Sequence, residues 1–423
     1  MPESVLRERI ADGVYFTTIC DSKFKTSHIS VRFVMRLDEK SVSKNALSIN
    51  ILSSANSNYP TQAAFSRKLS ALYGSILSGD VSKLGDNQVM TLSAKFIGDK
   101  YTLNGEALSN DMTQLLCDCI FSPASLNDEF DSALFAQRKQ NLIDDIEAEI
   151  NDKQSYAVIC ANRTIFRNEP YILTPSGTKE LVEECSTKSV YEAYKNMLRT
   201  ARVEISYIGE CADDVKALFG DAFEKLDRAP MDIAYYSLSS IKSATENVCD
   251  RIDVNQSKLY MAFKSESEDR YALAYMNVIF GATPFSKLFM NVREKMSLCY
   301  YCSSSYNEAK GALCVASGVD NTNIKKAEDE IINQLEDMKN GNFSDEDMEN
   351  SYKSIVNSLG MVDDYAGSLS QTYFKRILKN DITDFEQECE RYRSVTKQRI
   401  MDAAASLKLD TVYVMEASNG SNN

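Results

Sequence analysis

The chain has 423 residues, of which 43% are hydrophobic and 26% are charged, a composition typical of globular proteins. Its formal net charge is -14, which argues against binding nucleic acid or anionic membranes, because both need clustered lysine and arginine. There is one histidine, His28, so any mechanism that needs two histidines from one chain is excluded.

The N-terminal stretch and the cysteines bear on where the protein resides. MPESVLRERIADG contains no apolar signal-peptide core, and no apolar run approaches the roughly 20 residues that span a bilayer. The eleven cysteines do not have the regular spacing of a disulfide framework, which is typical of reduced thiols. We therefore expect a cytoplasmic protein. Cys299 and Cys302 form a CxxC pair, but no second pair completes a zinc site. We interpret them, like Cys117 and Cys119, as structural thiols.

The first half of the chain predicts strands, helices and a hairpin in a definite order. Strict alternation marks two strands, with His28 on the solvated face of the second. Gly85-Asp86-Asn87 is the turn signal of the hairpin. In chain order the predicted elements are strands at 13–19 and 28–35, a helix at 62–72, a hairpin at 72–96, a helix at 127–151 and a helix followed by a strand within 189–210.

The second half repeats this order. Its predicted elements are a strand at 258–264, a helix at 271–295, a hairpin at 298–319, a helix at 344–359 and a helix followed by a strand within 398–418. We therefore predict an N-terminal domain at 1–226, a linker at 227–247 and a C-terminal domain at 248–423. The fold class is α+β, with two homologous domains, each a mostly antiparallel sheet with helices packed on one face.

One segment of the second half carries a resemblance to a known family. Phe289-x-x-Val-Arg-Glu-Lys-x-x-Leu-x-Tyr300, in this tandem arrangement, resembles the pitrilysin, insulinase and mitochondrial processing peptidase family of zinc peptidases. The resemblance covers essentially the whole chain. It implies two halves that enclose a chamber, with Arg293 and Tyr300 as substrate-binding residues that face it. The structural alternative is that Arg293 forms an ion pair with Glu294 or another acid.

The zinc motif of that family is missing. Active relatives carry His-x-x-Glu-His on a helix, in which two histidines bind zinc and the glutamate activates water. The equivalent window here, Asn45–Pro60, places Ala46, Ile49 and Asn50 at those positions, and none can do this chemistry. The distal carboxylate of the family falls near Asp145, which we interpret as a solvated residue. We therefore expect no cofactor, no metal and no peptidase activity of its own.

A narrower resemblance suggests a role for such a chain. INDKQSYAVICANRTIFRNEPY and VYEAYKNML resemble a histidine-less bacterial branch of the family, labelled by association with modification of elongation factor P. This implies a heterodimer with an active HxxEH-bearing relative, in which this chain contributes surface that binds a peptide or protein substrate. Two alternatives stay open: a purely structural protein, and a peptidase with non-standard ligands such as Asp144, Asp145 and Glu147.

Overall fold

The computed structural model describes residues 4–149, 151–210 and 213–418. The chain divides into two compact units, each built from three separate segments. Unit 1 comprises Met1–Ala148, Leu173–Tyr235 and Val362–Ile382, and unit 2 comprises Glu149–Ile172, Tyr236–Met361 and Thr383–Asn423. No helix among the described residues is both long and apolar enough to cross a membrane.

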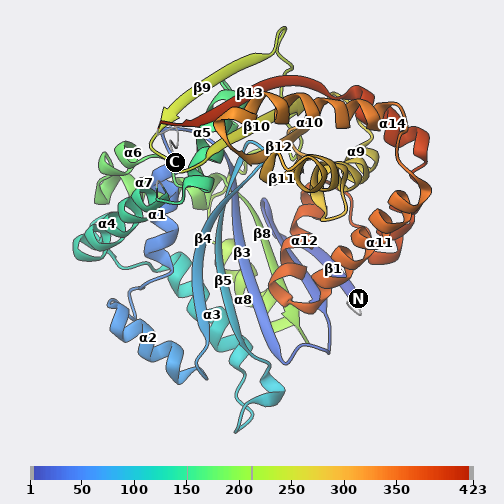
Figure 1. The fold of residues 1–423 in the computed structure, drawn as a ribbon. Coiled ribbons are helices and arrows are strands. Elements are labelled where there is room, and N and C mark those ends of the chain that lie inside the picture. The colour runs from blue at the N-terminus through green and yellow to red at the C-terminus, as the bar shows by residue number, and fades with distance from the viewer. Residues whose placement is uncertain (1–3, 150, 211–212, 419–423) are drawn as a thin grey trace. The chain divides into compact units, whose positions relative to one another are not determined.

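Unit 1 is built on a six-stranded sheet with the order β1-β2-β8-β3-β5-β4 (Figure 1). β2 and β8 are parallel, and the other neighbours are antiparallel. The strands are β1 (Ser4–Ala11), β2 (Val14–Cys20), β3 (Thr26–Arg36), β4 (Ile76–Leu84), β5 (Asn87–Ile97) and β8 (Arg202–Gly209), and a separate small hairpin joins β6 (Ser125–Leu126) to β7 (Glu129–Phe130).

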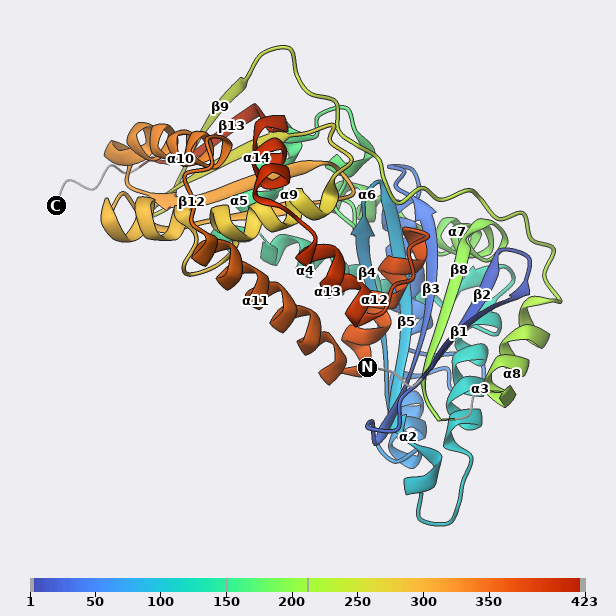
Figure 2. The same cartoon turned by 90° about the vertical axis from the view of Figure 1, so that its right-hand side faces the viewer.

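Helices cover both faces of this sheet. Figure 2 shows α3 and α8 on one face and α12 on the other, where Leu369 and Tyr373 pack against Ile19 and Ile208. The helical elements of unit 1 are α1 (Val42–Leu52), α2 (Gln62–Ala71), α3 (Leu108–Phe121), α4 (Ser132–Glu149), α6 (Lys179–Glu183), α7 (Thr187–Thr200), α8 (Asp213–Phe223), α12 (Ala366–Leu378) and the 3-10 turns η1 (Asp99–Tyr101) and η6 (Val362–Asp364).

Unit 2 contains a five-stranded sheet with the order β11-β12-β10-β13-β9. Its strands are β9 (Glu246–Ile252), β10 (Ser257–Lys264), β11 (Cys299–Asn307), β12 (Ala312–Val319) and β13 (Lys408–Ala417). Its helical elements are α5 (Lys153–Ile165), α9 (Arg270–Asn277), α10 (Ile324–Lys339), α11 (Asp345–Met361), α13 (Phe385–Arg393), α14 (Lys397–Ser406), the π-helices η3 (Val278–Ala282) and η4 (Leu288–Lys295), and the 3-10 turns η2 (Pro170–Ile172) and η5 (Asn321–Asn323).

The two sheets share one topology. The order β2-β8-β3-β5-β4 corresponds to β9-β13-β10-β12-β11, and in each the first pair is parallel and the rest antiparallel. The prediction of an α+β fold with two similar, mostly antiparallel sheets is confirmed. The expectation that helices pack on one face only is wrong, because α12 covers one face of the unit 1 sheet while α3 and α8 cover the other (Figure 2). The repeat boundaries at 226 and 247 stay a prediction, because the compact units are discontinuous in sequence: α5 packs on the sheet of unit 2, and α12 packs on the sheet of unit 1.

The sequence of α5 explains why it covers a sheet face. The Asp152 side chain accepts hydrogen bonds from the backbone N–H groups of Gln154 and Ser155, which caps the N-terminus of the helix. Small and apolar residues then recur four apart, at Ala157, Ala161 and Ile165, and all three are buried. Because side chains four apart share one side of a helix, they form the stripe that packs on β10 and β13.

Candidate functional site

The window that aligns with the zinc motif is part of the core of unit 1. α1 buries Ala46 and Ile49 completely, while Asn50 is partly exposed. β4 lies so close to this helix that a Cβ added at Gly79 would meet the Cγ2 atom of Ile49 at 2.9 Å. An alkyl side chain offers no lone pair to a metal, so this side of α1 is a packing surface.

The carboxylates of α4 are dispersed on the surface. Asp144 and Asp145 are exposed, and the Asp144 Oδ1 atom accepts a hydrogen bond from Gln140 Nε2 at 2.7 Å. Glu147 forms an ion pair with Lys179. Within the described part of the chain, no three histidine, cysteine or acidic side chains come together as a potential metal site.

Purified protein should therefore contain far less than one zinc per chain and should cleave no peptide. The physical reason is that the positions of both ligands and of the base hold Ala46, Ile49 and Asn50. Metal analysis by mass spectrometry after dialysis against zinc, together with a peptidase assay on a mixed peptide pool, measures both properties. One tightly held zinc per chain would contradict the expectation.

Arg293 lies on η4, in a backbone conformation that the sequence did not reveal. The N–H of Met296 donates to the carbonyl of Asn291, five residues earlier, at 3.1 Å. Such π-helical turns are rare and are frequently found at functional sites. The Arg293 side chain is 40% exposed; its guanidinium lies over the Phe289 ring at 4.5 Å, and its Nε atom is 3.5 Å from Glu294 Oε1.

Tyr300 protrudes from β11 at a β-bulge. The pairing of β11 with β12 shifts by one residue between Cys299 and Tyr301, so Tyr300 has no partner residue across the ladder. Its side chain is 61% exposed, and its hydroxyl lies 3.4 Å from Asp320 Oδ1. The structure thus places Arg293 and Tyr300 on two consecutive elements of unit 2, both accessible to solvent. That they face one cavity stays a prediction.

The strand that carries Tyr300 has an unpaired side. β11 is an edge strand, and among the described strands it pairs only with β12. An edge of this kind exposes backbone donors and acceptors to which an extended chain can add. Beside it lies a hollow of 240 Å³, with Tyr260 and Ala316 of the sheet, Ser303 of β11 and Asn162 and Phe166 of the α5 region among its lining residues. None of the described lining residues is charged.

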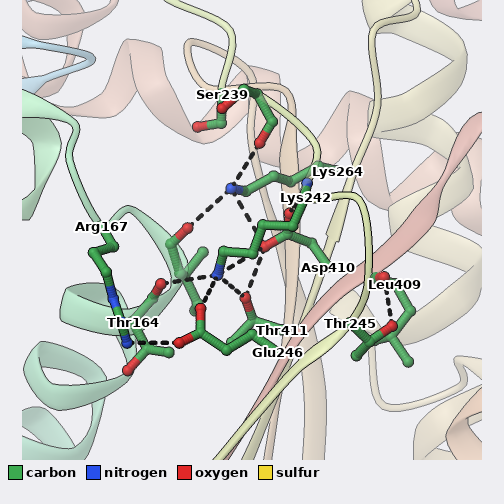
Figure 3. Close-up of polar contacts among 12 residues, drawn as sticks. Thr164, Arg167, Ser239, Lys242, Thr245, Glu246, Lys264, Leu409, Asp410 and Thr411 are labelled. Atoms are coloured by element: carbon green, nitrogen blue, oxygen red, sulfur yellow. Dashed lines mark hydrogen bonds and ion pairs between the residues drawn. The ribbon is translucent and has the colours of Figure 1, made fainter.

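A buried charge network fixes the helix that forms one wall of this hollow (Figure 3). Lys264 is 1% exposed, and its Nζ atom donates to the carbonyl of Ile165 at 2.9 Å and lies 3.3 Å from Asp410 Oδ2. Lys242 donates to the carbonyl of Thr164 at 3.0 Å and lies 3.4 Å from the same carboxylate oxygen. The last carbonyls of α5 are therefore held by two lysines that share one buried counter-ion.

The segment after α5 is held in the same way. Lys310, also 1% exposed, lies 2.8 Å from Glu169 Oε2. Asn307 of β11 donates from Nδ2 to the Tyr171 hydroxyl at 2.9 Å, and the Tyr171 ring packs edge-on against Phe166 with centroids 4.6 Å apart. These contacts connect the wall of the hollow directly to the edge strand.

Comparison with known proteins shows which family the chain resembles. Residues 184–354 match the family model described as the peptidase M16 inactive domain. The chain is similar to inactive M16-family peptidases. It is 29% identical over 402 residues to the probable inactive metalloprotease YmfF of Bacillus subtilis, with 94% of each chain covered.

Solved structures share the fold of this chain over nearly its whole length. A conserved protein from Enterococcus faecalis matches with a TM-score of 0.90 at 28% identity, covering 99% of this chain and 100% of the other. The structure titled as the peptidase M16 inactive domain from Pseudomonas fluorescens matches with a TM-score of 0.79 at 14% identity, covering 99% and 100% of the two chains. The predicted resemblance to a peptidase family without its zinc motif is confirmed.

Sequence reasoning missed the buried lysines of this protein. Lys264 lies at the end of a predicted strand and Lys310 in the turn of a predicted hairpin, where lysine is ordinarily exposed. No local pattern distinguishes them, because their partners Asp410 and Glu169 are distant in the sequence. The π-helical turns were missed for a related reason. Apolar periodicity predicts a helix but does not distinguish an α-helix from a π-helix, whose backbone hydrogen-bond pattern follows from packing.

Proposed function

We propose that this protein is a non-catalytic subunit that binds extended peptide segments along β11 and works beside a zinc-bearing relative. The observation that carries the proposal is the unpaired edge of β11 beside an uncharged hollow. Backbone hydrogen bonds along the edge would hold a peptide of any sequence, and the hollow would accept one of its apolar side chains. Arg293 would bind a peptide carbonyl or carboxylate, since a guanidinium offers several fixed donors.

The replacement Ala316→Phe should weaken peptide binding about tenfold, because the new ring fills a hollow that would otherwise bury an apolar side chain. The double replacement Arg293→Ala and Tyr300→Phe should weaken it further. Fluorescence anisotropy with a labelled, unstructured peptide rich in leucine and tyrosine measures the affinity. Matched controls are Ala405→Phe at an exposed position of α14 and Arg251→Ala on β9, at the opposite edge of the same sheet.

Equal affinities of all variants and the unchanged protein would contradict peptide binding at β11. The purely structural alternative would then be favoured, provided that the chain still forms a complex with its relative. Co-purification from the native host identifies that relative by its HxxEH motif. The same sample tests the proposed association with elongation factor P modification, because enzymes or substrates of that pathway should be enriched in it.

A further inference from the structure

We propose that Cys299 and Cys302 form a dithiol site that reacts with low-molecular-weight disulfides and closes into an intrachain disulfide. This modification site does not depend on peptide binding by β11. It revises the interpretation of the CxxC pair as inert structural thiols.

The β-bulge brings the two thiols to the same side of the strand. On a regular strand, residues three apart point to opposite faces. Here Tyr300 is the extra residue, so Cys299 lies opposite Val319 and Cys302 opposite Ser317. Val319 and Ser317 are two apart on β12 and therefore share a face, about 6.7 Å apart along the strand. That separation is at the upper end of the Cα–Cα range that disulfides span. Both cysteines pack in the same apolar core of unit 2.

The two thiols differ in accessibility and acidity. Cys299 is partly exposed, whereas Cys302 is 3% exposed. A hydrogen bond from the Cys302 thiol lowers the pKa of Cys299 to about 7, against the opposing effect of burial, and the Ser317 hydroxyl and Arg293 lower it too. The same hydrogen bond and burial raise the pKa of Cys302. Cys299 is therefore the attacking thiolate, and Cys302 is the resolving thiol.

The reaction proceeds by two exchanges. The Cys299 thiolate attacks one sulfur of the small disulfide, a mixed disulfide forms, and the other half of the reagent leaves as a thiolate. Cys302 gives up its proton and attacks Cys299 Sγ, so the intrachain bond forms and the second half leaves as a thiolate. The two cysteines lose two electrons, the small disulfide gains them, and the two thiol protons pass to solvent or to the released thiolates.

The test is to incubate the reduced full-length chain with oxidised glutathione at neutral pH and follow each cysteine by peptide mass spectrometry. Cys249 is the internal control, because it is exposed, yet burial and Glu416 raise its pKa. Cys299 should react about tenfold faster than Cys249, and the peptide that contains Cys299 and Cys302 should end two hydrogens lighter. Faster reaction at Cys249 would overturn the proposal.

Single replacements separate the two steps. Cys302→Ser should stop the reaction at a stable glutathione adduct on Cys299, and Cys299→Ser should leave Cys302 unmodified. Arg293→Gln should slow the reaction of Cys299 a few-fold without changing Cys249. A glutathione adduct on Cys299 that persists in the unchanged protein, with Cys302 still reduced, would also overturn the intrachain disulfide. Thermal melting of each variant confirms that it is folded.

Discussion

Replacing Asp410 by alanine should lower the free energy of unfolding by about 3–5 kcal/mol. Asp410 is 1% exposed and is the buried carboxylate shared by Lys264 and Lys242. Its removal leaves the Nζ atom of Lys264 in the interior, with Glu169 Oε1 3.8 Å away as its remaining acidic neighbour. A buried charge that loses its partner is destabilising, whereas replacement of a whole ion pair by apolar residues is often neutral.

Chemical denaturation, monitored by circular dichroism, measures this effect. Asp402→Ala on the exposed side of α14 removes the same charge and should change stability by less than about 0.5 kcal/mol. The double variant Asp410→Leu with Lys264→Met should recover much of the loss. If Asp410→Ala were as stable as Asp402→Ala, the network would contribute nothing to holding α5.

The same network predicts the pH dependence of stability. Burial alone raises the pKa of Asp410, but the backbone N–H of Lys242, the hydroxyl of Thr411 and the ammonium groups of Lys264 and Lys242 hold it below its ordinary value. A carboxylate with a lowered pKa contributes stability that is fully present above its ordinary pKa. That contribution should be lost as the pH falls below about 4, and Asp410→Ala should reduce the acid sensitivity of unfolding.

Replacing Arg32 by alanine should loosen α12 on the sheet of unit 1 and destabilise the protein by about 2–4 kcal/mol. Arg32 is 4% exposed, and burial lowers its pKa to about 10, so it remains charged at neutral pH. Its guanidinium donates to the hydroxyls of Ser30 at 2.6 Å and Ser370 at 2.8 Å, and it lies over the Phe374 ring at 4.8 Å. Two of these three partners belong to α12.

Hydrogen exchange of the α12 backbone amides should therefore accelerate in Arg32→Ala, more than exchange in α3 on the other face. Arg36→Ala is the matched control, because Arg36 lies four residues further along β3 and is exposed. Arg32→Met keeps most of the volume and should cost less than about 1.5 kcal/mol. Unchanged protection of α12 in Arg32→Ala would show that the apolar contacts of Leu369 and Tyr373 alone hold the helix.

Much of the fold could be predicted because each half repeats the same local patterns. Alternation in β3 and β10 and the hairpins that follow them are local signals, and the structure places them at equivalent positions of the two sheets. The location of α5 and α12 could not be predicted in this way. Both helices are amphipathic, and the pattern of Ala157, Ala161 and Ile165 predicts a buried stripe without specifying which sheet it meets.

The features of the candidate site that depend on residue type could be predicted from the sequence. The features that depend on packing between distant parts of the chain could not. Ala46 and Ile49 cannot bind zinc in any fold, because their alkyl side chains offer no lone pair. His28 was expected to be solvated, whereas the structure buries it in part. Burial, with Arg32 and Lys95 nearby, lowers the pKa of His28 to about 4.

The discontinuity of unit 1 has a consequence during translation. The last strand of its sheet ends at Gly209, but the helix that covers Ile19 and Ile208 begins only at Ala366. At about 5–20 residues per second, a ribosome needs roughly 8–30 s to synthesise the chain between them. During that interval Ile19, Ile208 and the charged Arg32 lack the helix that covers them, so this face of the nascent sheet stays open to non-native contacts. A fragment that ends before α12 would leave this face uncovered permanently and would leave Arg32 without Ser370 and Phe374, so the first half of this protein is poorly suited to independent expression.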